Sequence, residues 1–170
     1  TLTPFFRLAY NCPVSFAVRA ITLDLDDTLW PFAPIGMRIE QALQDWFLAH
    51  SPTTAERFPI PAMRALRDRV FAENPPLLHD LSALRRLSIE AALRDSGGDP
   101  ALADAAYETF HAARNQVDFH PEAPAALREL AALRPLAALS NGNADLERIG
   151  IDHLFRFRLG AKDFGRAKPD

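Results

Sequence analysis

Cysteine is nearly absent from this sequence of 170 residues. The single cysteine, Cys12, cannot form a disulfide within the chain and excludes a zinc site built from several cysteines. No run reaches the roughly 18 consecutive apolar residues that a membrane-spanning helix requires. Residues 1–18 contain Arg7 as their one cation and make a poor signal peptide. These absences are typical of a cytoplasmic protein that does not contact a membrane.

Positive charge is not in excess either. The 19 basic and 22 acidic residues give a formal net charge of −3, so the basic surface typical of nucleic-acid binding is missing. Apolar residues make up 48% of the chain and charged residues 24%, which is enough apolar material for a buried core. Only two of the cations are lysine, Lys162 and Lys168, so these two positions stand out in a chain that otherwise uses arginine.

The periodicity of apolar residues changes along the chain. Residues 17–25 form a short β-prone run that ends in acids, which predicts a strand with charge at its carboxyl end. Between residues 34 and 117 the apolar positions recur with the period of an α-helix. They form four stripes, Ile35–Phe47, Met63–Phe71, Leu81–Ala92 and Leu102–Ala113. Four amphipathic helices in succession predict a small helical bundle.

After the bundle, helical and extended patterns alternate again. The segments are a helix over 125–133, a buried strand over 136–139 and an edge strand over 155–159. Strands separated by helices predict an α/β protein with a parallel sheet. We therefore expect an α/β core formed by residues 1–33 and 118–170, with the helical bundle of residues 34–117 inserted after the first strand.

Two acids end the first predicted strand. Asp24 and Asp26 alternate with Leu25, so both carboxylates leave the strand tip on the same side. Two acids this close call for a cation, most simply Mg²⁺ held by oxygen ligands. One carboxylate could attack phosphorus to form an aspartyl phosphate while the other moves a proton. The alternative is a solvated acidic turn in which Thr28 caps a neighbouring element.

A second polar cluster, Ser140–Asn143, follows the strand over 136–139. Its hydroxyl and the backbone amides of a glycine-containing turn suit a phosphoryl oxygen. A simple turn with Asn143 as a helix N-cap explains the same residues. Lys168 could neutralise charge between the acids and a transferring phosphoryl group. The alternative for Lys168 is a solvated surface lysine, and the scarcity of lysine favours a functional role.

Together these elements resemble the haloacid dehalogenase-like superfamily of phosphotransferases. The resemblance rests on Asp-x-Asp-x-Thr after one strand, Ser-Asn after another, and Lys-Pro-Asp, and it covers nearly the whole chain. It implies a Rossmann-like core, a four-helix cap that closes over a small phosphorylated substrate, and Mg²⁺ bound by Asp24 and Asp26. It also implies that Asp24 is the nucleophile, Asp26 the general acid/base and Lys168 a stabiliser of charge. The phosphate-binding residues expected from it are Thr28, Ser140 and Asn141.

The acid at position 26 favours a phosphatase within this family, because the dehalogenase branch lacks a second acid there. A narrower set of residues is similar to the bacterial phosphatases that act on flavin mononucleotide and on the ribitylaminouracil phosphate of riboflavin synthesis. The set consists of Asp24–Trp30, His79 and Asp80 followed by Arg85, and Ser140–Asn143. This similarity makes a riboflavin-related phosphate the expected substrate.

Four residues of the predicted cap and hinge also have simpler explanations. His79 is typical of a helix start, and Arg85 and Arg86 are expected to solvate one face of the bundle. Trp30 could pack the hinge between core and cap, or it could stack on a flavin ring.

The family's fourth motif, a Gly-Asp pair with another acid shortly after it, belongs behind a later strand. A literal match in this sequence, Gly98-Asp99 with Asp104, lies inside the helical region, where Asp99 is typical of a helix N-cap. Without that motif we expect weak metal binding, because Asp24 and Asp26 alone supply few oxygen ligands.

The family's sheet order would leave the first strand at an open edge. Ile21 and Leu23 would then lie uncovered, so we expect association with a second chain through residues 18–24. A rival interpretation is a truncated, catalytically silent domain that binds only phosphate or a partner chain.

Overall fold

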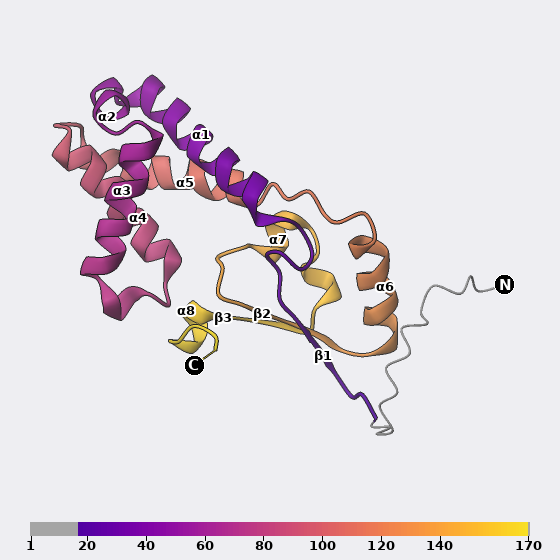
Figure 1. Ribbon diagram of the computed structural model, residues 1–170. Helices are drawn as coiled ribbons and strands as arrows, with labels where there is room; N and C mark the ends of the chain where they lie inside the picture. The colour runs from indigo at the N-terminus through magenta and orange to yellow at the C-terminus, as the bar shows by residue number, and fades with distance from the viewer. Residues whose placement is uncertain (1–16, 170) are drawn as a thin grey trace.

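The computed structural model describes residues 17–169, and Figure 1 shows its α/β part beside a bundle of helices. The helices are α1 (Phe32–His50), α2 (Pro52–Arg57), α3 (Ile60–Glu73), α4 (Leu81–Asp95), α5 (Ala103–Arg114), α6 (Ala123–Leu133), α7 (Leu146–Ile149) and α8 (Ala161–Phe164). The strands are β1 (Ile21–Leu23), β2 (Leu136–Ser140) and β3 (Phe157–Gly160). Short 3₁₀ turns cover Pro75–Leu77, Pro100–Leu102 and Asp152–Leu154.

The three strands form one parallel sheet in the order β1-β2-β3. Leu23 pairs with Ala138, and Ser140 pairs with Gly160. The α/β class and the parallel sheet predicted from the sequence are thereby confirmed, although β1 is shorter than the predicted run. Because parallel strands end at the same edge, Asp24 and Ser140 leave the sheet on the same side.

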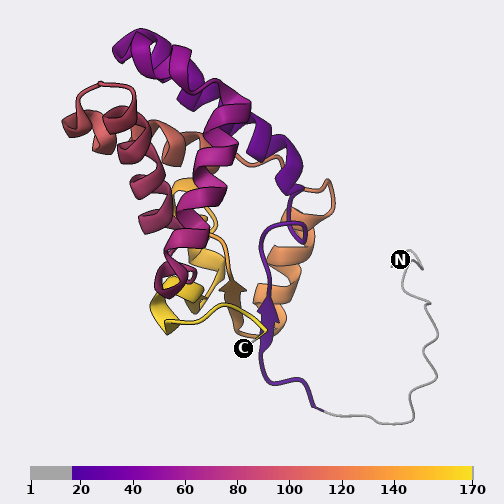
Figure 2. The ribbon, with the colours of Figure 1, turned by 60° about the vertical axis from the view of Figure 1, so that its left-hand side comes forward.

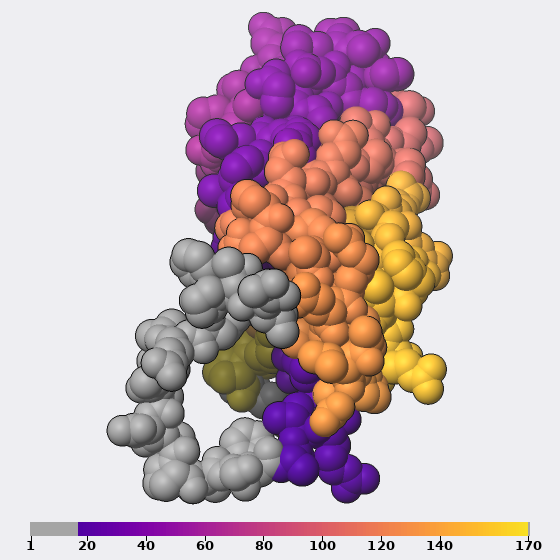
Figure 3. All heavy atoms as spheres, turned by 90° about the vertical axis from the view of Figure 1, so that its right-hand side faces the viewer, coloured from indigo at the N-terminus to yellow at the C-terminus, as the bar shows by residue number. Residues whose placement is uncertain are grey.

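Apolar residues of the sheet and of α6 form the core of the α/β part. Leu136 and Ala138 on β2 are buried together with Leu127 on α6 and with Leu25 just after β1. In Figure 3 the orange atoms of α6 lie in front of the α/β part, with the purple helices above them. This packing fixes the ends of β1 and β2 relative to each other.

The helical bundle of residues 32–114 follows the predicted stripes. Helix α1 packs against α5 and buries the face that carries Ile35, Ile39, Leu43 and Phe47. Figure 2 shows the helices of the bundle above the strands of the sheet. Asp80 is the N-cap of α4, since its Oδ1 accepts the N–H of Ala83 at 3.0 Å. Helix α2 was not expected, because six residues are too few to show a helical period. Within residues 17–169, no helix is both long and apolar enough to cross a bilayer.

One side of β1 carries no partner strand among the described residues. Ile21 and Leu23 are half-buried and pack against the core, whereas Thr22 is exposed on the other face. We propose that residues 1–170 associate through this edge, chiefly by way of the unpaired backbone groups of β1.

Replacing Thr22 by Lys is expected to lower this association without emptying the core, because strand side chains alternate between faces and a charge discourages edge pairing. Light scattering of residues 1–170 and of T22K over a range of concentrations measures the effect. Thr22→Val is the matched control, because it keeps the side chain neutral and β-prone and should associate as before. A strictly monomeric unmodified chain would contradict the proposal.

Candidate active site

Asp24 directly follows β1 at the carboxyl edge of the sheet. Its Oδ1 accepts the N–H of Leu25 at 2.8 Å, and its Oδ2 lies 2.9 Å from Nζ of Lys168. Leu25 is buried and anchors the turn, whereas the Asp24 side chain is 46% exposed. Asp24 therefore presents an accessible carboxylate with a cation beside it.

Lys168 is held in place by Asn141. The Lys168 N–H donates to Asn141 Oδ1 at 2.7 Å, and Asn141 Nδ2 donates to the Lys168 carbonyl oxygen at 3.0 Å. The Lys168 ammonium also donates to the carbonyl oxygen of Leu139 at 2.7 Å. The structure thus places the Lys168 ammonium beside Asp24, and the role of Lys168 as a stabiliser of charge stays a prediction. Asn141 is hydrogen-bonded to the main chain of Lys168, and its contact with phosphate stays a prediction.

Asp26 is bound on both carboxylate oxygens. Its Oδ1 accepts the Nε1–H of Trp30 at 2.8 Å, and Nη2 of Arg114 lies 2.8 Å from Oδ1 and 2.7 Å from Oδ2. Trp30 is 0% exposed and packs edge-on against Phe119, with 5.4 Å between ring centroids. Packing at the hinge is confirmed for Trp30, and stacking on a flavin ring is excluded in this conformation.

Arg114 is a residue of this cluster that sequence reasoning missed. It is the last residue of α5 and is only 2% exposed. A signal was present, because Arg114 lies one helical turn beyond Phe110 and so continues the apolar stripe of this helix. A charge on a buried face requires a partner, and the partner here is Asp26.

The turn of residues 140–143 packs directly on this ion pair. Ser140 is 5% exposed, and its Oγ accepts the N–H of Gly142 at 3.0 Å. A Cβ on Gly142 would lie 2.5 Å from Asp26 Oδ2 and 3.1 Å from Arg114 Nη2, so a residue without a side chain is required there. Asn143 Oδ1 accepts from Arg114 Nε at 3.2 Å.

Two acids act as N-caps near the proposed site and within the bundle. Asp145 is the N-cap of α7 and accepts the N–H groups of Glu147 and Arg148. The interpretation of Asn143 as that N-cap is therefore wrong. Asp99 accepts the N–H of Ala101 at 2.9 Å and is the N-cap predicted for it.

Thr28 lies in the exposed turn after Asp26. Its N–H donates to the carbonyl oxygen of Leu25 at 3.2 Å, and its hydroxyl makes no hydrogen bond within the described part of the chain. Asp27 has φ of 56° in this turn and accepts the N–H of Phe32 at 2.8 Å, which fixes the start of α1. The Thr28 hydroxyl is thus accessible, and its role in phosphate binding stays a prediction.

The oxygen atoms at the sheet edge fit part of a Mg²⁺ shell. The Asp24 carboxylate is one ligand of the right kind, and the main-chain carbonyl oxygen of Asp26 is another, since no backbone N–H of residues 17–169 donates to it. The carboxylate of Asp26 is bound by Arg114 and Trp30. Residues 17–169 contain no group of three or more His, Cys, Asp or Glu side chains placed to hold a metal.

A cavity of about 400 Å³ lies between the helical bundle and the edge of the sheet. Its core wall includes the turn of residues 140–143 and Lys162, and its bundle wall includes His79, Arg86 and Tyr107. His79 is half-buried just before α4, as expected for a residue at a helix start. The cavity therefore opens beside the predicted phosphate-binding turn.

The second lysine of the chain connects the two walls of this cavity. Nζ of Lys162, in α8, lies 3.3 Å from Oδ2 of Asp80, the N-cap of α4. Asn143 Nδ2 donates to Ser82 Oγ at 3.3 Å across the same gap. Arg148 of α7 donates to Glu108 of α5 at 2.6 Å. These polar contacts hold the bundle against the core around the cavity.

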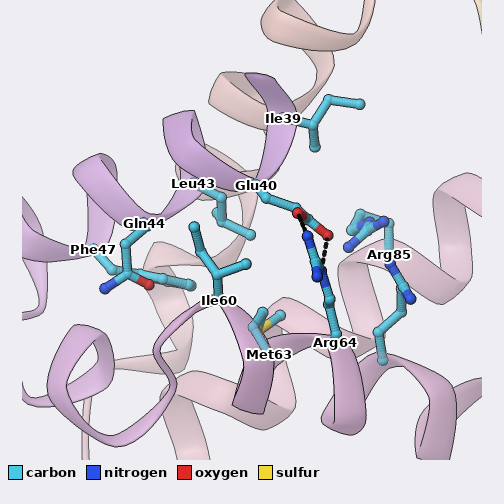
Figure 4. A pocket seen from close by; sticks show the side chains of 10 residues that line it. Ile39, Glu40, Leu43, Gln44, Phe47, Ile60, Met63, Arg64 and Arg85 are labelled. Carbon is cyan, nitrogen blue, oxygen red and sulfur yellow. Dashed lines mark hydrogen bonds and ion pairs between the residues drawn. The ribbon is translucent and has the colours of Figure 1, made fainter. Parts of the chain in front are cut away.

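A smaller hollow of about 20 Å³ lies inside the bundle, where Figure 4 shows Glu40 paired with Arg64 and Arg85 beside them. Arg64 Nε donates to Glu40 Oε1 at 2.6 Å, and this bond lowers the pKa of Glu40. Arg85 lies 4.7 Å from the centroid of the Phe110 ring, and burial lowers its pKa to about 10. The expectation that Arg85 solvates a bundle face is wrong, whereas Arg86 is exposed as expected. The hollow has room for roughly one water molecule and is too small for a substrate.

Comparisons with known proteins agree with this geometry. A family model described as haloacid dehalogenase-like hydrolase matches residues 18–170. The chain is 34% identical over 156 residues to the 5-amino-6-(5-phospho-D-ribitylamino)uracil phosphatase YigB of Escherichia coli strain K12, covering 89% of this chain and spanning 65% of that protein.

Solved structures are similar as well. A structure titled 2-haloacid dehalogenase from Pseudomonas syringae pv. tomato DC3000 matches with a TM-score of 0.82 and 39% identity, over 91% of this chain and 68% of that one. The L-2-haloacid dehalogenase PA0810 matches with a TM-score of 0.52 and 28% identity, over 91% and 66%. By the family model and by the relative in E. coli, the chain belongs to the haloacid dehalogenase-like hydrolase family.

Proposed function

We propose that the protein is a Mg²⁺-dependent phosphatase of small phosphorylated metabolites that acts through an aspartyl phosphate. The observation that carries the proposal is the different environment of two acids at the end of one strand. Asp24 is exposed beside Lys168, as a nucleophile must be, and Asp26 is held by Arg114 and Trp30. Two carboxylates with different surroundings suit two different roles.

In the first half of the reaction, a carboxylate oxygen of Asp24 attacks the phosphorus atom of the substrate. The bond between phosphorus and the ester oxygen breaks, and that oxygen takes a proton from Asp26, which enters this half as the carboxylic acid, and leaves as an alcohol. Asp26 is then the carboxylate that pairs with Arg114. The Lys168 ammonium, 2.9 Å from Asp24 Oδ2, offsets the negative charge that gathers at the phosphoryl group.

In the second half, a water oxygen attacks phosphorus in the aspartyl phosphate. Its proton passes to the Asp26 carboxylate, the bond to Asp24 breaks, and inorganic phosphate leaves. Both acids return to their starting states. A bound Mg²⁺ would polarise the phosphoryl oxygens and bring them to the Asp24 carboxylate.

Dehalogenation is the second candidate, because two similar structures carry that name. An aspartate nucleophile serves both reactions, but the leaving groups differ. A halide leaves as an anion and requires no proton, whereas the oxygen of a phosphate ester leaves readily only when it is protonated. Asp26 supports the phosphatase, since a proton donor beside the nucleophile has a use there and none in halide release.

The substrate proposal rests on the cavity beside the turn of residues 140–143 and on the relative in E. coli. A volume of about 400 Å³ is within the usual size of a metabolite site, and polar side chains line much of it. The relative's name states that it acts on 5-amino-6-(5-phospho-D-ribitylamino)uracil. We propose that this phosphate or flavin mononucleotide is the substrate, which would place the protein in riboflavin synthesis in the cytoplasm.

Product release tests the proposal. The full-length protein is incubated with Mg²⁺ and either phosphate esters or a 2-haloacid. The esters are ribitylaminouracil phosphate, flavin mononucleotide and ribitol 5-phosphate, and the haloacid is 2-chloropropionate. We expect inorganic phosphate from the esters, a loss of that activity with excess EDTA, and no chloride.

Two other outcomes would contradict the proposal in different ways. Chloride release without phosphate release would assign the protein to the dehalogenases. No turnover of either class, together with measurable binding of inorganic phosphate, would support the rival interpretation of a catalytically silent domain.

A further inference from the structure

Arg114 joins the helical bundle to the acid that moves the proton. It ends α5, which in Figure 1 leads from the bundle toward the core. Its Nη2 contacts both carboxylate oxygens of Asp26, and its Nε donates to Asn143. Among residues 17–169, no other cation forms an ion pair with Asp26. Arg114 is thus the one charged contact of Asp26 in the described chain.

Burial distinguishes this pair from the ion pairs on the surface. The Arg114 side chain is 2% exposed, whereas the arginines of the other ion pairs among residues 17–169 are 28% exposed or more. Nη1 of Arg114 is buried without a hydrogen-bond partner in the described part of the chain. A guanidinium group retained in such surroundings is held in one geometry by its contact with Asp26, because removing Asp26 would leave the buried charge of Arg114 without a partner.

The carboxylate of Asp26 is confined from three sides. The indole of Trp30 binds Oδ1, Arg114 binds both oxygens, and the missing side chain of Gly142 leaves the space that Oδ2 occupies. A carboxylate with these contacts has one orientation, and Arg114 supplies its charged contact. Asn143 in turn orients Arg114 from the turn after β2.

We propose that Arg114 is a positioning residue for Asp26, which orients the proton-transferring carboxylate and links that orientation to the placement of the helical bundle. The inference rests on the proposed phosphatase function. A purely structural role, in which Arg114 only attaches the bundle to the core, is the alternative that the test must separate.

The leaving group of the substrate distinguishes a positioning role of Arg114 from a purely structural one. An alkoxide is strongly basic and leaves phosphorus only with a proton from Asp26, whereas p-nitrophenolate leaves without one. Loss of correct positioning should therefore slow the first half of the reaction far more for an alkyl phosphate than for p-nitrophenyl phosphate. Hydrolysis of the aspartyl phosphate, in which Asp26 takes the water proton, is common to both esters. Loss of overall folding or of bundle attachment would slow both substrates alike.

The experiment measures kcat/KM, which covers the steps up to release of the alcohol or phenol, for ribitol 5-phosphate and for p-nitrophenyl phosphate in the full-length protein and in Arg114→Gln. We expect kcat/KM to fall by about 10²-fold for the alkyl ester and by less than about 5-fold for the aryl ester. Arg114→Lys keeps the cation without the planar guanidinium group, guards against a failure of R114Q to fold, and should give an intermediate ratio. In an Asp26→Asn background, R114Q should leave the ratio of the two rates unchanged.

Arg94→Gln is the matched control, because Arg94 is exposed on α4 and pairs only with Glu90 among the described residues. Both rates should stay as in the unmodified protein. Equal losses on both substrates in R114Q, or a further change in their ratio in the D26N background, would overturn the positioning role. An unmodified protein that hydrolyses neither ester would instead overturn the proposed function.

Discussion

Replacing Asp24 by Asn in the full-length protein is expected to abolish phosphatase activity, with kcat reduced by about 10⁴-fold or more. The amide cannot attack phosphorus to form the acyl phosphate, and no other described carboxylate lies beside Lys168 at the end of β1. Folding should change little. The ion pair with Lys168 is partly exposed, and such pairs contribute about 1 kcal/mol or less. The Asn side-chain oxygen can still accept the N–H of Leu25.

The measurement pairs phosphate release with the melting temperature, so that loss of chemistry is separated from loss of structure. Asp27→Asn is the matched control. Its carboxylate lies in the same acidic turn but accepts the N–H of Phe32 at the start of α1, and we expect D27N to retain most of its activity. Retained turnover of a phosphate monoester by D24N would show that Asp24 is not the nucleophile.

The architecture could be predicted from the sequence wherever an apolar pattern ran over several turns or alternated at a strand. The four stripes correspond to α1, α3, α4 and α5, and the two polar strand ends correspond to the ends of β1 and β2. Helices α2 and α8 were not predicted, because segments of six and four residues are too short to show a helical period. The N-cap at Asp99 was readable, since it is a short acceptor just before a helical segment.

The site could be predicted only where its chemistry lay in local sequence. Asp24, Asp26 and Lys168 were visible as acids after a strand and as a rare lysine, and the structure places Lys168 beside Asp24. Arg114 lies 88 residues from Asp26 in sequence, so no local spacing reveals their pairing. Arg85 was misjudged for a related reason, because a side chain with a long apolar stem can lie inside a bundle while it looks polar in the sequence.

Excising most of the helical bundle is the second change for which a large effect is expected. The excision should remove residues 34–113 and join the ends with a short Gly-Ser linker. Arg114 and Asn115 should stay, because Arg114 pairs with Asp26 and Asn115 Oδ1 accepts the N–H of Asp145 at 2.7 Å. The ends can be joined, since the Arg114 guanidinium lies 5.4 Å from the Phe32 ring.

The variant that lacks residues 34–113 is expected to fold and to hydrolyse p-nitrophenyl phosphate, because Asp24, Asp26 and Lys168 all lie outside the excised segment. It should lose its discrimination between ribitylaminouracil phosphate and ribitol 5-phosphate by about 10-fold or more in the ratio of kcat/KM. The physical reason is that His79, Arg86 and Tyr107 form the bundle wall of the cavity and are removed. What remains of the cavity is its core wall, including the turn of residues 140–143, which is predicted to bind the phosphate group that both esters carry.

Single substitutions on α4 provide a matched comparison that leaves the bundle in place. Arg86→Ala removes a side chain that lines the cavity, whereas Arg94→Ala removes an equally long one that faces solvent on the same helix. We expect R86A to shift selectivity in the same direction as the excision, and R94A to leave it unchanged. A shortened protein that preferred ribitylaminouracil phosphate over ribitol 5-phosphate as strongly as the intact one does would contradict this prediction. In that outcome the residues that determine specificity would lie in the α/β core, and the bundle would only cover the site.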